Sequence, residues 1–283
     1  MGANPVTGTM SRPSSWGLDL GVALCFRLVG ALTLVVQLAA CGSGGGANGA
    51  SVNGDTPPQT TAAQANFDLL FFGNSHTAVN DVPAQVAAML RAANPGKSVS
   101  TAMQPDWMHL DERGSHGPSL AMLSSRKWTH VVLQAQNYSA SGQFVYPTTG
   151  AEKLVRLTRE QGSKPVLFAE WPRQGINETA RIYETYSTVA RAQPACLPPI
   201  PQAFDLSLAR HPQIVLHNAD GNHSAPAGAF LAALLLFAAI DATPIDSLPA
   251  LSGIAVDTGT QRLLRLVARD TAAAVSPRNY CGG

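Results

Sequence analysis

The sequence predicts an α/β fold with a parallel sheet, because short apolar runs alternate along the chain with amphipathic helical patterns. The first run, FDLLFF at 67–72, lies between Asn66 and Gly73 and has the continuous apolar character of a strand buried on both faces. Comparable runs predict three further strands, near 98–103, 130–135 and 165–170. The alternation therefore indicates one parallel sheet with helices on both faces.

The expected helices are those segments whose apolar residues recur at spacings of three and four. They lie at 83–93, 150–161 and 178–192. Segment 227–240 is apolar on all sides, which is typical of a deeply buried helix and is too short to cross a bilayer. A last amphipathic helix is expected over 258–274, capped by Asp257 or Thr258.

Composition excludes some classes of protein and some kinds of site. Of the 283 residues, 45% are apolar and 13% are charged, and the net charge is +1. A nucleic-acid-binding protein needs a basic stripe on its surface, which this balance of charges does not favour. The four cysteines form no CxxC pair and no HExxH occurs, which excludes the commonest zinc sites. We expect no nucleic acid, no metal and no organic cofactor.

The N-terminal segment has the pattern of an export signal. After Arg27, residues 28–40 are apolar or small, and the run ends at Cys41. It is shorter than the roughly 20 residues that cross a bilayer and fits the hydrophobic region of a signal peptide. The LAAC sequence that ends at Cys41 resembles a bacterial lipobox, which implies cleavage after residue 40 and lipid on Cys41. The alternative is a buried core helix with an incidental cysteine.

We expect three parts in the chain. These are a lipoprotein signal peptide over 1–40, a tether over 41–66 and a catalytic domain over 67–283. The tether is rich in Gly, Ala, Thr and Pro and has no aromatic residue, so it cannot bury enough apolar surface to fold. The mature protein is then expected at the cell envelope, held at the outer membrane by the lipid on Cys41, on its periplasmic or surface side.

Removal of the signal and lipidation of Cys41 leave two cysteines in the domain. Cys196 and Cys281 are expected to form a disulfide in an oxidising compartment, which would fasten the C-terminal tail to a proline-rich loop near residue 196. Two buried free thiols are the alternative.

Candidate catalytic residues lie in two loops. In an open parallel sheet, ligands bind beyond the carboxyl ends of the strands, and the loop after the first predicted strand is GNSHT, which contains Ser75. A serine hydroxyl needs a base to remove its proton, and that base is usually a histidine oriented by a carboxylate. His223 has Asp220 three residues before it, in a turn that lets the carboxylate accept from one ring nitrogen. We therefore expect Ser75 as nucleophile, His223 as base and Asp220 as the orienting acid.

Three segments carry a resemblance to a known family. LLFFGNSHTAVNDVP, HVVLQAQN and DGNHSAPAGAFLAA resemble the first, third and fifth sequence blocks of the SGNH (GDSL-type) hydrolases, especially a bacterial subgroup with GNSxT and VVLQxQ. The resemblance covers about residues 67–245. It implies a flavodoxin-like three-layer α/β/α sandwich and hydrolysis of carboxylic esters through Ser75. It also implies an oxyanion hole made by the Ser75 amide, a second-block amide and a third-block side-chain amide.

The second block departs from the family pattern. Relatives have a glycine pair there, whereas this chain has Pro105, which has no amide proton, followed by Asp106, whose amide is the remaining candidate donor. In the third block, Gln136 and Asn137 are both candidates. Two other functions stay open: a catalytically silent binding or scaffold lipoprotein, and an esterase that removes acetyl groups from envelope or plant-type carbohydrates.

Overall fold

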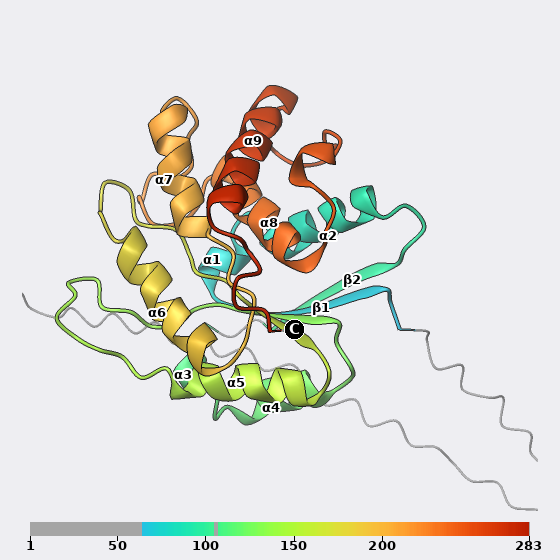
Figure 1. Cartoon of the computed structure of the whole chain (residues 1–283), viewed down its shortest axis with the longest axis vertical. Coiled ribbons are helices and arrows are strands. Elements are labelled where there is room, and N and C mark those ends of the chain that lie inside the picture. The colour runs from blue at the N-terminus through green and yellow to red at the C-terminus, as the bar shows by residue number, and fades with distance from the viewer. Residues whose placement is uncertain (1–63, 105–106, 283) are drawn as a thin grey trace, which may run out of the picture. The chain divides into compact units, whose positions relative to one another are not determined.

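Four short strands form a parallel sheet in the order β2-β1-β3-β4, which is the flavodoxin-like arrangement (Figure 1). The strands are β1 (Phe67–Phe72), β2 (Val99–Gln104), β3 (His130–Leu133) and β4 (Lys164–Leu167). Phe72 is paired with Gln104 on one side and with Leu133 on the other. All four strands therefore end at the same edge of the sheet, called the carboxyl edge below.

The computed structural model describes residues 64–104 and 107–282. These residues fall in one unit, Thr60–Gly283. The expected signal segment 1–40, Cys41, the tether as far as residue 63, and the Pro105–Asp106 pair lie outside the described residues.

Helices cover both faces of the sheet, so the predicted α/β/α sandwich is confirmed (Figure 1). One face packs against α2 (Val82–Ala93), α7 (Ile200–Arg210), α8 (Pro226–Ile240) and α9 (Thr258–Ala274). The other face packs against α3 (Leu110–Arg113), α4 (Gly117–Ser124), α5 (Thr149–Glu160) and α6 (Thr179–Ala192). The short α1 (Ser75–Ala78) follows β1, and a 3₁₀ turn (Ile245–Ser247) follows α8.

Alternation along β1 explains the two cores. Leu69 and Phe71 belong to the core that contains α8, whereas Leu70 and Phe72 belong to the core that contains α5, because successive side chains of a strand point to opposite faces. The apolar helix α8 is almost wholly buried, as its sequence predicts. Within residues 64–104 and 107–282, no helix is both long enough and apolar enough to cross a membrane.

The structure differs from the sequence-based expectation in the lengths of two strands and in four additional helices. β3 ends at Leu133 and β4 at Leu167, two and three residues earlier than expected, although Gln134 and Phe168 stay buried. Helices α1, α3, α4 and α7 were not expected. Helix α7 begins inside the proline-rich segment. Pro201 lies in its first turn, where backbone amides have no acceptor within the helix, so the amide proton that proline lacks is not missed.

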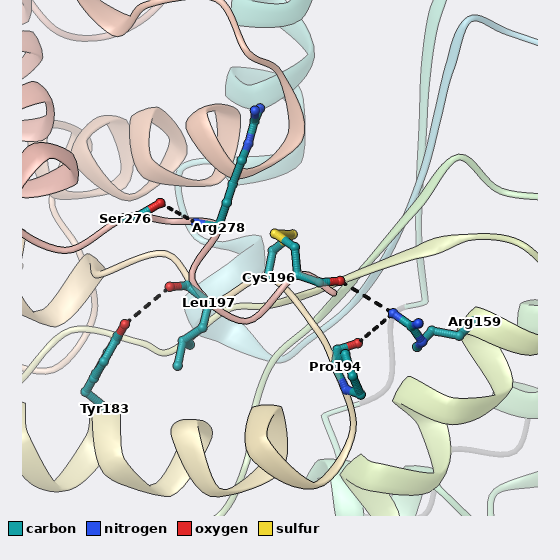
Figure 2. The surroundings of a disulfide bond; sticks show 8 residues. Arg159, Tyr183, Pro194, Cys196, Leu197, Ser276 and Arg278 are labelled. Atoms are coloured by element: carbon teal, nitrogen blue, oxygen red, sulfur yellow. Dashed lines mark hydrogen bonds between the residues drawn. A yellow bond between two sulfur atoms is a disulfide. The ribbon is translucent and has the colours of Figure 1, made fainter. Parts of the chain in front are cut away.

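A disulfide joins Cys196 to Cys281 across 85 residues of sequence (Figure 2). Cys196 pairs with the edge of β4 as a single bridge, because its amide donates to Pro165 O at 3.0 Å and its carbonyl accepts from Leu167 N at 2.8 Å. Arg159 donates to the carbonyls of Pro194 and Cys281 at 3.3 and 3.4 Å. The disulfide and this arginine together fasten the C-terminal tail beside the edge of the sheet.

Candidate active site

Ser75 is the first residue of α1 and lies just beyond the carboxyl end of β1. Asn74 caps this helix, and its side-chain oxygen accepts from the His76 amide at 2.9 Å. Gly73 allows the turn to close, because a Cβ atom there would lie 2.2 Å from Thr77 Oγ1 and 2.9 Å from Gln134 Oε1. The GNSHT segment, Gly73 to Thr77, therefore forms a tight strand-to-helix turn, called the nucleophile turn below.

Gln134 holds the nucleophile turn in place from the neighbouring strand. Its Oε1 accepts from Asn74 N at 2.8 Å and from Thr77 Oγ1 at 2.9 Å, and its Nε2 donates to Asn74 Oδ1 at 2.9 Å. Sequence analysis did not single out this residue. Its position in the sequence could have indicated this role, because Gln134 directly follows the buried strand β3, and the end of β3 pairs with the end of β1.

Asp220 and His223 are held together in one short loop. His223 Nδ1 lies 2.5 Å from Asp220 Oδ2, and Asp220 Oδ1 accepts from the amides of Asn222 and His223, both at 2.9 Å. The hydrogen bond from His223, followed by those two amides, lowers the pKa of Asp220 to about 2, so this carboxylate is ionised at neutral pH. When Nδ1 donates to the carboxylate, Nε2 is left as the basic nitrogen of the ring.

The base of that loop is closed by a bridge between His217 and Ser224. Asn218 N donates to His223 O at 2.8 Å, which fixes the backbone that carries the imidazole. The Trp171 indole, which is buried, donates to Asn222 O at 2.9 Å and supports the loop from the carboxyl end of β4. The loop is therefore fixed at its base and on one side.

The fold brings this loop to the nucleophile turn. The rings of His223 and His76 are stacked with centroids 5.3 Å apart, and His76 directly follows Ser75. A second link comes from Asn80 Nδ2, which donates to Ser224 O at 2.7 Å. Among the described residues, no hydrogen bond joins Ser75 Oγ to His223, and such catalytic contacts commonly tighten only when substrate binds.

The two third-block oxyanion candidates are placed differently. Gln136 is buried, and its Nε2 donates to the carbonyls of Asn137 and Pro147, both at 3.1 Å. Asn137 is half-buried and lines a cavity of about 260 Å³, and within the described part of the chain its side-chain amide has no hydrogen-bond partner. Asn137 is therefore the third-block residue with an amide free to donate, while Asp106 lies outside the described residues.

Glu170 is a buried carboxyl near this site that sequence analysis missed. Tyr186 Oη donates to Glu170 Oε2 at 2.6 Å and accepts from the amide of Gln136 at 2.9 Å, and the side chain of Gln134 lies beside Glu170. Burial raises the pKa of Glu170 to about 7, although these hydrogen bonds oppose the shift. One carboxyl thus connects the third-block loop with the glutamine that holds the nucleophile turn.

This raised pKa predicts a pH-dependent stability. Because folded Glu170 keeps its proton up to about pH 7 while the unfolded chain loses it near pH 4.5, the contribution of Glu170 to the free energy of unfolding should fall as the pH rises through that interval. The expected contribution is about 3 kcal/mol. Glu170→Gln should remove this decrease, because the amide resembles the protonated acid.

Urea unfolding at pH 5 and pH 8 checks this, and the surface variant Glu160→Gln is the control. Equal pH dependence in Glu170→Gln and the wild type would show that Glu170 does not titrate in this range.

In the part of the chain that the structure describes, no three His, Cys, Asp or Glu side chains gather in a group that could hold a metal ion. The structure brings together an imidazole with an ionised carboxylate on Nδ1 and the turn that carries the Ser75 hydroxyl. This set is suited to nucleophilic attack on a carbonyl carbon.

Comparison with known proteins gives likenesses in structure but none in sequence. No family model and no curated protein matches the chain. A DUF4886 family protein from Bacteroides uniformis aligns with a TM-score of 0.57 and 15% identity, over 75% of this chain and 96% of that one. This likeness shows that the two chains share a fold.

Two further solved structures align less closely. A candidate SGNH hydrolase from Slackia heliotrinireducens has a TM-score of 0.48 and 25% identity, over 62% of this chain and 98% of that one. TesA has a TM-score of 0.43 and 17% identity, over 60% of this chain and 96% of that one. The parallel sheet in the order 2-1-3-4, with GNSHT directly after its first strand, is the α/β/α arrangement that the resemblance of the sequence blocks to the SGNH hydrolases implies.

Proposed function

We propose that the protein is a serine hydrolase that cleaves carboxylic esters by acyl transfer through Ser75. The observation that carries the proposal is the pairing of His223 with an ionised Asp220 beside the turn that presents Ser75. A serine becomes a nucleophile only when such a base is within reach.

In the proposed reaction, His223 Nε2 takes the proton of Ser75 Oγ as the oxygen attacks the ester carbonyl carbon. The negative charge on the carbonyl oxygen is met by the amide of Ser75 and by the side chain of Asn137, with the Asp106 amide as third donor. His223 then returns the proton to the leaving alcohol, which leaves an acyl group on Ser75. Water, deprotonated by the same imidazole, releases the acid and restores the serine.

Hydrolysis of p-nitrophenyl acetate and butyrate tests this proposal. We expect a burst of nitrophenol equal to about one equivalent of enzyme when release of the acyl group is the slow step. If protein that melts cooperatively hydrolyses neither ester, the proposal is contradicted.

The second candidate function is a binding or scaffold protein that has lost catalysis. It is favoured by Pro105–Asp106 in place of the glycine pair of relatives, since losing one oxyanion donor lowers turnover by about 10²- to 10³-fold. An esterase that removes acetyl groups from carbohydrates differs from the first proposal only in its substrate. Acetylated sugars assayed beside the nitrophenyl esters separate these cases.

We also propose that the protein is an exported lipoprotein. The proposal rests on the apolar run over 28–40, the LAAC sequence and the polar tether that follows. Cys41→Ser should abolish incorporation of an alkyne-labelled fatty acid in cells, whereas Cys25→Ser should leave it unchanged. Label that persists without Cys41 would contradict lipidation at this residue.

A further inference from the structure

His76 lies between the two loops that carry the proposed catalytic residues. It belongs to the nucleophile turn, and its ring Nδ1 lies 3.3 Å from Asn74 Oδ1 in that turn. Across the site, the side chain and the backbone of Asn222 lie beside the His76 ring and favour its protonated form. Asn222 directly precedes His223, so His76 connects two segments that are far apart in sequence.

The His76 ring is also the middle member of a row of aromatic rings. It is stacked with His223, with centroids 5.3 Å apart and an interplanar angle of 28°, and it also contacts Trp171, with centroids 5.2 Å apart. Trp171 is stacked on Phe204 at 5.1 Å, and Phe204 belongs to the core on the α8 face. The His223 imidazole is therefore connected, through His76, to buried side chains of the core.

The charge state of His76 suits this position. Burial, followed by the nearby positive charge of protonated His223, lowers the pKa of His76 to about 4. His76 is thus neutral at pH 7, so its ring can lie against an imidazole that becomes positively charged during acyl transfer without repelling it. The other ionisable group that acts on His76 is Asp220, which favours a positive charge but is outweighed by burial.

We propose that His76 is a positioning residue that holds the His223 imidazole, and the loop that carries it, against the nucleophile turn. This inference rests on the proposed serine hydrolase function, since it assigns His76 a role in that same site. His76 is not the base itself: its ring is stacked beside that of His223, whereas the ionised carboxylate that orients a catalytic imidazole pairs with His223. Asn80 holds the loop backbone through Ser224, whereas the ring of His223 is contacted by Asp220 at Nδ1 and is stacked with the ring of His76.

Variants at position 76 separate the ring from the remaining contacts. His76→Ala removes both the stacking and the contact of the ring with Asn74, and we expect kcat to fall by up to about 10²-fold with KM little changed, because misplacement of a catalytic group by about 1 Å costs that much. His76→Phe restores a neutral ring, and kcat should recover to within about tenfold of the wild type. His211→Ala removes a histidine that follows α7, outside these contacts, and should leave kcat unchanged.

A proton NMR measurement tests the positioning without any turnover. The His223 Nδ1 proton, hydrogen-bonded to Asp220, should give a far-downfield resonance that is lost in His223→Gln. We expect it in the wild type and in His76→Phe, and we expect exchange with water to broaden it in His76→Ala. If the wild type does not hydrolyse esters, the proposed function fails while this resonance still tests the role of His76. The inference is overturned if His76→Ala keeps both the sharp resonance and the wild-type kcat, or if His76→Phe loses as much of both as His76→Ala.

Discussion

Replacement of Ser75 by alanine is expected to lower ester hydrolysis by about 10⁴- to 10⁶-fold, the loss seen when a serine hydrolase loses its nucleophile. The fold should stay intact, because the Ser75 side chain makes no hydrogen bond to other described residues and alanine is a good residue for the first turn of a helix. Rates with p-nitrophenyl butyrate and a thermal melt of the same preparation check both statements.

The partners of Ser75 should show that the three residues act as one unit. His223→Ala should lose nearly as much activity as Ser75→Ala, and the double variant should lose little more than either, because the serine and its base act together. Asp220→Asn should lower the rate of ester hydrolysis less than Ser75→Ala or His223→Ala does, because it leaves both the nucleophile and the base in place. A Ser75→Ala variant that keeps the wild-type rate would contradict the assignment.

Removal of the Cys196–Cys281 disulfide is expected to have the largest effect on stability. A crosslink that closes a loop of 85 residues restricts the unfolded chain, and its loss should lower the free energy of unfolding by about 4.5 kcal/mol. The double variant Cys196→Ser, Cys281→Ser should therefore unfold at much lower urea concentration than the oxidised wild type. Treatment of the wild type with a reductant should produce a shift of similar size.

The control for this prediction is the double variant itself under the reductant, where no further shift is expected. Equal urea midpoints for the oxidised wild type and the double variant would show that the crosslink does not stabilise the domain. Ester hydrolysis at low temperature should differ little between them, because both cysteines line a cavity with His130 and Lys164, the first residues of β3 and β4, whereas Ser75 follows the carboxyl end of β1.

The α/β class could be predicted from the sequence because its signals are local. The continuous apolar runs and the spacing of apolar residues in the helices identified each strand and the long helices within a few residues. Helix α7 was missed because Pro194, Pro198 and Pro199 indicate a loop, although a proline in the first turn of a helix is well tolerated. Strand ends were overestimated because buried apolar residues continue past the last residue paired in the sheet.

The candidate site could be predicted only where its residues are close in sequence. Asp220 and His223 are three residues apart, so their pairing in one turn could be predicted. Ser75 could be predicted as the nucleophile because it lies in the loop after the first strand. The contacts of Gln134 with Asn74, of Glu170 with Tyr186, and of His76 with His223 depend on how distant loops meet at the carboxyl edge. A single sequence carries no local signal for such contacts.

Labelling of the purified protein with a fluorophosphonate tests the central claim most directly, because an activated serine attacks its phosphorus, releases fluoride and forms a stable phosphonate ester. We predict one label per chain, located by mass spectrometry on the peptide that contains Ser75, and a large decrease in labelling in His223→Ala. Absence of label from folded wild-type protein, or label on another serine in place of Ser75, would contradict the account.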